Sequence, residues 1–225
     1  MVDAKEGHAK SVSTYDTKVQ ETIREKLFEI LPEAVFVGEE DDVHVSIKKG
    51  FAFIVDPIDG TTNFIKDYHV SAISVGLAKD GEKYIGVVYN PYLDEMFTAE
   101  RGKGAFLNGR PIHVSRNPLS EGIVLFGTAP YYEELSKKSF QMAYAYFKKA
   151  LDVRRSGSAA IDLCSIAAGR AELYFELRLS PWDFAAGALI VEEAGGVVTT
   201  VEGGAVTLGQ KCSVLATNGR CGRLE

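Results

Sequence analysis

Apolar residues recur at two different spacings along the first half of the chain. From Asp16 to Pro32, apolar residues stand three or four positions apart, which predicts an amphipathic helix. The first dozen residues are polar and without a period, so no element is predicted there. Apolar or alternating runs predict short strands joined by turns, over residues 34–37, 51–56, 70–78, 83–89, 95–100, 104–107 and 111–114. The first half is therefore expected to form a helix packed on an antiparallel sheet.

The pattern changes beyond a polar segment at residues 115–120, where strands and helices alternate. Strands are predicted over residues 122–127, 151–153, 171–177, 197–201 and 213–217, and helices over residues 131–150, 158–169 and 182–194. Such alternation favours a mixed or partly parallel sheet. An α/β (α+β) chain with two halves, residues 1–118 and 119–225, is therefore predicted.

Composition narrows the range of functions. The 225 residues carry a formal net charge of −6, and Lys and Arg are scattered, which argues against a nucleic acid or an anionic membrane as the main partner. No apolar run reaches the roughly 18 residues of a membrane span, and the N-terminus is too polar for a signal peptide. Three cysteines without a paired motif suggest neither disulfides nor a zinc site. A reduced, cytoplasmic location is expected, with the four histidines in loops or at the surface.

The most informative stretch is FAFIVDPIDGTTNF at residues 51–64, an apolar run that ends in two acids. Asp56 is expected to end a buried strand because Pro57 interrupts the backbone ladder. Two close carboxylates, Asp56 and Asp59, repel unless a cation neutralises them, so Mg²⁺ is implied. Gly60 permits a tight turn, which leaves N–H groups suited to a phosphate. The alternative is an ordinary strand end with Asp-Pro and Asp-Gly turns.

Other acids occupy comparable positions. Glu39 and Glu40 follow a short apolar strand, although taken alone they favour a solvated acidic loop, since Asp41 and Asp42 continue the charge. Asp183 falls in the first turn of a predicted helix, where a carboxylate is favoured by the helix dipole alone. Trp182 beside it is more typical of a core than of a site. Taken singly, none of these residues decides the chemistry.

Together these motifs resemble the inositol monophosphatase-like family of Mg²⁺-dependent, lithium-sensitive sugar phosphatases. The resemblance is carried, in the right order over nearly the whole chain, by GEE at residues 38–40, DPIDGTTNF at 56–64, GSAA at 157–160 and WDFAAG at 182–187. It implies a layered α/β/α/β/α sandwich with the site at the junction of the two halves. It also implies a homodimer that takes small phosphorylated polyols or sugars.

The resemblance implies roles residue by residue. Glu39, Asp56 and the carbonyl of Ile58 would bind one Mg²⁺, and Asp56, Asp59 and Asp183 a second. Glu39 and Thr61 would orient and deprotonate the attacking water, with Asp59 as a further catalytic residue. Backbone N–H groups of Gly60 and Thr61 would hold the phosphate. The residues expected beside the sugar or alcohol are Asp59, Gly157, Ser158, Ala159 and Glu176. Metal ions would activate the water and neutralise the leaving oxygen, so no phosphoenzyme is needed.

The chain departs from the family pattern near its start. Members usually begin with a long helix ahead of the point where this chain starts. Lys10 and Ser11 stand where an Asp and a bulky apolar residue are usual, whereas Lys5 and Asp16 match. These departures bear on the N-terminal loop, on a third and weaker Mg²⁺ and on the homodimer, and they leave the two-metal residues intact.

Three alternatives stay open. Inositol monophosphate is the leading substrate, with fructose 1,6-bisphosphate, 3′-phosphoadenosine 5′-phosphate and histidinol phosphate as related candidates. A haloacid-dehalogenase-type phosphatase would use Asp56 as a covalent nucleophile, but two residues separate its acids here, which puts the second out of register. A family member without catalysis, acting as a binding or regulatory protein, is the alternative from another class.

Overall fold

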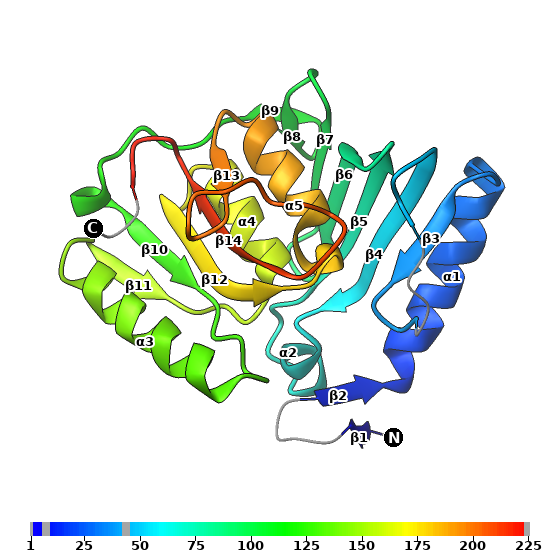
Figure 1. Ribbon diagram of the computed structural model, residues 1–225, viewed down its shortest axis with the longest axis horizontal. Helices are drawn as coiled ribbons and strands as arrows, with labels where there is room; N and C mark the ends of the chain where they lie inside the picture. Colours follow the sequence, from blue (N-terminus) through cyan, green and yellow to red (C-terminus); the bar gives the residue numbers. More distant parts are fainter. Residues whose placement is uncertain (1, 6–9, 42–45, 223–225) are drawn as a thin grey trace.

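Two sheets, one from each half of the chain, dominate the computed structural model, which describes residues 2–5, 10–41 and 46–222 (Figure 1). The first sheet has seven strands in the order β3-β4-β5-β6-β7-β8-β9. Their bounds are β3 Val35–Gly38, β4 Phe51–Asp59, β5 Ala72–Lys79, β6 Glu82–Asn90, β7 Glu95–Glu100, β8 Ala105–Leu107 and β9 Arg110–Ile112. All neighbours pair antiparallel, as predicted, except β3 and β4.

The parallel pairing of β3 with β4 was not expected from the alternating pattern. Because the two strands run in the same direction, both end at the same edge of the sheet. Gly38 pairs with Val55 in this ladder. The residues that follow them, Glu39 and Asp56, therefore emerge side by side.

The second sheet is mixed, as predicted, with five strands in the order β11-β10-β12-β14-β13. Their bounds are β10 Ile123–Phe126, β11 Asp152–Arg154, β12 Leu173–Leu179, β13 Val197–Thr199 and β14 Cys212–Thr217. β10 runs parallel to both β11 and β12, whereas β14 runs antiparallel to β12 and β13.

Helices separate and cover the two sheets (Figure 1). Their bounds are α1 Thr14–Ile30, α2 Thr61–Ile65, α3 Glu133–Phe147, α4 Ala159–Ala167 and α5 Pro181–Glu193. The apolar side of α1 packs on β3 and β4, and α3 covers the outer face of the second sheet. α4 and α5 lie between the sheets. These layers form the α/β/α/β/α sandwich that the family resemblance implies.

The main core is continuous from one sheet to the other. It contains Ile54 and Val88 of the first sheet, Tyr174 and Val214 of the second, and nearly all the apolar residues of α4 and α5. The proposed boundary between residues 118 and 119 falls between the sheets, in the connection from β9 to β10. The division of the chain into two domains at this boundary stays a prediction. α5 packs against both sheets.

Four short elements were not predicted. β1 (Val2–Lys5) and β2 (Lys10–Ser13) pair as an antiparallel ribbon, so the prediction of no element in this polar segment was wrong. Backbone hydrogen bonds hold such a ribbon together without an apolar period. α2 and the 3₁₀ turn η1 (Leu119–Glu121) are too short to show helical spacing.

The remaining expectations concern exposure. His69 and His113 are exposed and outside the regular elements, as expected, while His8 and His44 lie outside the described residues. All three cysteines are free. Within the described ranges, no helix is long and apolar enough to cross a membrane.

Candidate active site

Glu39 and Asp56 form a carboxyl pair at the shared edge of β3 and β4. The Glu39 N–H extends the parallel ladder by donating to the Val55 carbonyl over 3.1 Å. Burial raises the pKa of Glu39 to about 7 and that of Asp56 well above its ordinary value, and the two side chains hydrogen bond to each other. Two carboxyl groups in this arrangement must share a proton or accept a cation.

The turn from Asp56 to Gly60 differs from the prediction in one respect. β4 does not end at Asp56 but continues through Pro57 to Asp59, with a bulge in its pairing to β5. A bulge tolerates proline because one backbone N–H is left out of the ladder. The Ile58 N–H bonds the Asp56 carboxylate over 3.0 Å, and Gly60 adopts a φ of +93°. The bulge thus brings Asp56 and Asp59 onto the same short turn.

Thr61 begins α2 and faces a residue to which the sequence assigned no role. Its hydroxyl lies 3.2 Å from Asp16 Oδ1 and 3.1 Å from the Ile58 carbonyl, so its single proton can be donated to either oxygen. Asp16 is 1% exposed although it lies in the first turn of α1. An acid in a helical first turn is unremarkable in sequence, but its match to the family pattern was a signal that could have identified it.

Asp59 joins the two halves of the chain. Its carboxylate accepts hydrogen bonds from the Ser158 hydroxyl (2.5 Å) and from the N–H groups of Ala160 (2.7 Å) and Ala159 (3.3 Å), at the start of α4. Burial raises its pKa to about 6, while these donors oppose the rise. The predicted residues Gly157, Ser158 and Ala159 are thereby held against the acidic turn.

Asp183 reaches the same region from the start of α5. Its carboxylate accepts the Ser180 N–H over 2.6 Å in a capping box. The start of the helix is fixed to β5 because the Ser74 hydroxyl donates to the Trp182 carbonyl, and Ser74 pairs with Asp56 in the sheet. Burial, followed by the negative charges of Glu39 and Asp59, raises the pKa of Asp183 well above its ordinary value.

Glu176 lies on β12 and is 8% exposed. Its two carboxylate oxygens accept hydrogen bonds from the Ala129 N–H and the Tyr174 hydroxyl, both over 2.9 Å. A Cβ at Gly127 would lie 1.8 Å from Glu176 Oε2, so a larger residue there would displace this carboxylate. Glu176 therefore holds the segment that follows β10, an arrangement that the sequence did not predict.

These acids supply hard oxygen ligands, which suit Mg²⁺. As they stand, no three His, Cys, Asp or Glu side chains in the described part of the chain are arranged to hold a metal ion. The hydrogen bonds account for this, because Asp59 and Asp183 accept protein donors while Glu39 and Asp56 bond to each other. An ion bound here would replace the shared proton, as metal binding to acids generally does.

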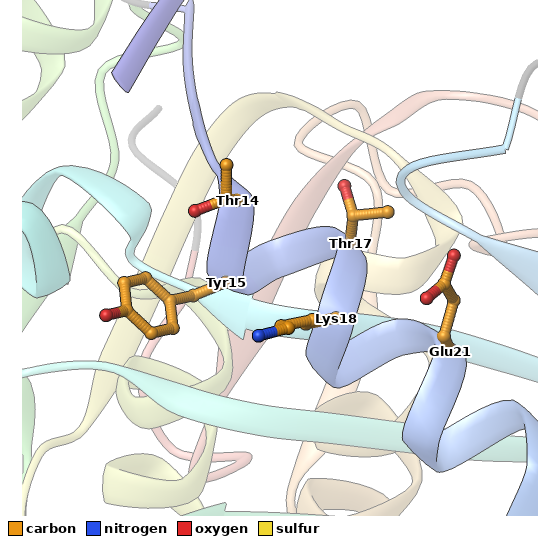
Figure 2. A pocket seen from close by; sticks show the side chains of 5 residues that line it. All are labelled: Thr14, Tyr15, Thr17, Lys18 and Glu21. Carbon is orange, nitrogen blue, oxygen red and sulfur yellow. The ribbon is translucent and has the colours of Figure 1, made fainter. Parts of the chain in front are cut away.

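A separate pocket of about 400 Å³ lies along the first turns of α1. Figure 2 shows its five lining side chains, with Thr14, Thr17 and Glu21 on one side of the helix and Tyr15 and Lys18 on another. None of these was predicted as a site residue. The pocket therefore lies on the outer side of α1, whereas the buried Asp16 faces the acids.

The layered fold and the acidic site at the meeting of the two sheets define a phosphoric monoester hydrolase. Residues 1–223 match the model of the inositol monophosphatase family, and the chain belongs to that family. Members of the family act on phosphorylated sugars and polyols.

Individual relatives agree with this assignment. An inositol-1-monophosphatase of Rhizobium meliloti is 42% identical over 199 residues, which are 88% of this chain and 75% of that protein. A protein of Vibrio cholerae named Nus factor SuhB is 40% identical over 194 residues, covering 86% of this chain and 73% of its own length. A staphylococcal IMPase-II solved with inositol monophosphate bound is 31% identical, with a TM-score of 0.82 over 92% of this chain and 80% of that one.

Proposed function

We propose that the chain is a Mg²⁺-dependent phosphomonoesterase that hydrolyses a small polyol or sugar phosphate by direct attack of water, with inositol monophosphate as the leading substrate. One observation carries the proposal. Glu39 and Asp56 bond carboxyl to carboxyl, and the charges of Asp59 and Asp183 act on them as well. Such a group of acids is costly to bury without a cation.

Two ions are proposed. Glu39, Asp56 and the carbonyl of Ile58 would hold one, and Asp56, Asp59 and Asp183 the second, with a third and weaker ion as a further expectation. When bound, Mg²⁺ lowers the pKa of water and neutralises charge on the phosphate and the leaving oxygen. The chain's contribution is to fix these ligands at the end of β3, in β4 and at the start of α5.

Side chains and backbone groups of the chain would accept the proton of the water, orient that water and bind the phosphate. Glu39, at the edge of the acidic cluster, would accept the proton of the attacking water. Thr61 would orient that water, with Asp16 accepting the threonine proton. The N–H groups of Gly60 and Thr61, beside the acids, would bind phosphate oxygens.

The alcohol would lie against the start of α4 and against Glu176 of β12. Gly157, Ser158 and Ala159 are held there by Asp59, and Asn63 of α2 bonds the preceding Ser156 carbonyl over 2.9 Å. Glu176 would accept hydroxyl hydrogen bonds with the lone pairs that Ala129 and Tyr174 leave available.

Phosphate release from a substrate series tests the proposal. The purified chain is incubated with inositol 1-phosphate, fructose 1,6-bisphosphate, 3′-phosphoadenosine 5′-phosphate and histidinol phosphate, with Mg²⁺ or with a chelator. Release that depends on Mg²⁺ and occurs without a phosphorylated protein intermediate is expected. Phosphate trapped covalently on Asp56 would instead favour the haloacid-dehalogenase-type mechanism.

Three further properties are proposed from family membership: inhibition by lithium, a homodimer and a cytoplasmic location. Lithium is expected to inhibit the Mg²⁺-dependent turnover. Sedimentation analysis of the purified chain is expected to give twice the mass of one chain. Cell fractionation would test the location.

A binding or regulatory role without catalysis is the second candidate. It is favoured by the relatives at 37% to 40% identity that are named Nus factor SuhB. The complete set of mutually repelling acids argues against binding as the sole function. Absence of phosphate release from every substrate in the series with Mg²⁺ present would favour it.

A further inference from the structure

α1 carries a row of three polar residues, Asp16, Gln20 and Arg24, spaced four positions apart. Residues at this spacing lie one above the other on the same face of a helix. Asp16 is 1% exposed and Gln20 is 3% exposed, although both are polar. Polar side chains that are buried in this way need hydrogen-bond partners elsewhere in the chain.

The Gln20 carboxamide bonds the two residues that follow Glu39. Its Oε1 accepts the Glu40 N–H over 3.1 Å, and its Nε2 donates to Asp41 Oδ1 over 3.2 Å. The acceptor and the donor of the amide are both used, so these two bonds fix its orientation. Gln20 thus holds the turn that carries Glu39 from the side that follows this residue.

Asp41 holds the same turn from the side that precedes Glu39. Its Oδ2 accepts the Gly38 N–H over 3.1 Å, and its Oδ1 also accepts a bond from Arg24 Nη2 over 2.5 Å. The Asp41 N–H in turn donates to the Gly38 carbonyl over 3.3 Å. Hydrogen bonds therefore fix the backbone on both sides of Glu39.

The packing between α1 and this turn is close. A Cβ at Gly38 would lie 2.2 Å from Gln20 Oε1 and 2.8 Å from the Phe36 ring, so the missing side chain lets the amide approach the backbone. The Arg24 guanidinium carbon stands 4.4 Å from the centre of the Phe36 ring, which holds this arginine against β3. The turn is thus held on α1 by packing as well as by hydrogen bonds.

The same row of residues contacts a second segment of the site. Asp16, one turn before Gln20, lies 3.2 Å from the Thr61 hydroxyl at the start of α2. α1 therefore contacts both the turn after β3 and the turn after β4. The carboxyl groups of Glu39 and Asp56, which bond to each other, belong to these two segments.

We infer that Gln20 is a positioning residue for the reaction, because it holds the turn after β3 so that the Glu39 carboxyl stays opposite Asp56. This inference rests on the proposed function, in which Glu39 binds Mg²⁺ and accepts the proton of water. Gln20 would act through the Glu40 backbone and through Asp41, without contact to the substrate. Side chains that orient metal ligands typically contribute about ten- to a hundredfold to metal affinity or activity.

Gln20→Met tests the inference, because it keeps the length of the side chain and removes both hydrogen bonds. Mg²⁺ affinity would be measured by isothermal titration calorimetry with the metal alone, and kcat and KM with inositol 1-phosphate at saturating Mg²⁺. We expect Mg²⁺ affinity and kcat each to fall about ten- to a hundredfold, with KM within about threefold. Gln20→Glu keeps an acceptor for the Glu40 N–H, so it should recover part of both losses.

Asn218→Leu is the matched control. Asn218 is also a buried carboxamide, 5% exposed, and its Nδ2 donates to the Ser115 hydroxyl and the Asn117 carbonyl. It follows β14 in the second sheet, whereas α1 packs on the first. This variant should lower the melting temperature and leave Mg²⁺ affinity and kcat within about twofold. A purely structural role of Gln20 would give the same result for Gln20→Met.

Asp41→Ala provides a second test that leaves α1 unaltered. The Asp41 side chain is 22% exposed and lies in a turn, so its loss should be tolerated by the fold. Mg²⁺ affinity and kcat should again fall. In the double variant with Gln20→Met, the loss should be smaller than the product of the two single losses, because both residues act on one turn.

Unchanged Mg²⁺ affinity and kcat in both Gln20→Met and Asp41→Ala would overturn the inference and leave the proposed function standing. Absence of Mg²⁺-dependent phosphate release by the unaltered chain would instead overturn the proposed function. In that case, weaker Mg²⁺ binding by Gln20→Met than by Asn218→Leu would still support the positioning of the acids by Gln20.

Discussion

Asp183 combines a structural and a chemical role in one carboxylate. It caps α5 through the Ser180 N–H, and it lies among the other acids of the site. Asp183→Asn keeps an oxygen for the cap but removes the charge. We expect Mg²⁺-dependent turnover to fall by roughly a hundredfold or more, as for loss of a metal ligand, with the melting temperature little changed.

Steady-state kinetics and thermal unfolding of the same preparations would check this expectation. Glu25→Gln is the matched control, since it removes one exposed carboxylate from α1. Near-normal turnover of Asp183→Asn would remove this residue from the site.

Buried carboxyls with raised pKa values make stability depend on pH. Burial raises the pKa of Glu39 from 4.5 to about 7 in the folded chain, so the folded state holds this proton more tightly than the unfolded chain does. This contribution to stability is fully present below pH 4.5, the pKa in the unfolded chain. It is lost as the pH rises through about 7, the pKa in the folded chain. Without metal, the protein should therefore become less stable over this range.

Mg²⁺ is expected to reverse that loss, because it binds the ionised acids. The rise in melting temperature on adding Mg²⁺ should be larger at about pH 8 than at about pH 5. Glu39→Gln should flatten the pH dependence of the metal-free protein. A Mg²⁺ effect that is equal at both pH values would argue against a cation replacing the shared proton.

For individual residues, the sequence motifs predicted more of the candidate site than the turn-forming residues alone would have done. Asp56, Asp59, Glu39 and Asp183 were predicted site residues, and the structure brings them to neighbouring elements. Asp16 was not predicted, because an acid in a helix shows by itself nothing of what it faces and only its match to the family pattern pointed to it.

Among the elements, α5 packs unusually close to the first sheet. Gly76 and Gly86 pair across β5 and β6 beneath the helix, and a Cβ at Gly86 would lie 2.6 Å from the Ala186 carbonyl oxygen. Gly86→Ala must therefore push backbone against backbone. We expect a loss of about 1–3 kcal/mol in the free energy of unfolding, seen as a lower midpoint in urea.

Gly209→Ala provides the comparison, because no atom would lie within 4 Å of its new Cβ. It should unfold at nearly the same urea concentration as the unaltered chain. If Gly86→Ala matched it, the helix would have room to move away from the sheet.

Long helices and strands with regular apolar spacing were predictable from the sequence, and short elements were not. α1, α3, α4 and α5 follow from apolar spacing, and the hairpin of β5 and β6 follows from alternation around Asp80 and Gly81. α2 is only five residues long, and β3 shows no feature that would indicate a parallel partner. Strand direction depends on where the connecting chain runs, which periodicity does not record.

On the scale of the whole molecule, the two sheets share one core through α4 and α5. Asp59 adds a polar link from β4 to the start of α4. We expect the chain to unfold as a single cooperative unit, although the sequence suggests two halves. Far-ultraviolet and near-ultraviolet circular dichroism should give coincident transitions in urea.

Two separate transitions would instead support independent domains at residues 1–118 and 119–225. The layered sandwich itself could not be predicted from periodicity, because apolar spacing shows that a helix has a buried side and not which sheet covers it. It was expected only from the family resemblance. Packing that joins segments far apart in the chain is the part of the fold that local patterns leave out.

The position of the one tryptophan in the chain has a practical consequence. Trp182 stands next to Asp183 at the start of α5, partly buried against the shared core, and its carbonyl is bonded to Ser74 of β5. Indole emission responds to local polarity and to nearby charge. The protein therefore carries an intrinsic fluorophore beside its acids, and titration of Mg²⁺ or inorganic phosphate should change its emission without any label.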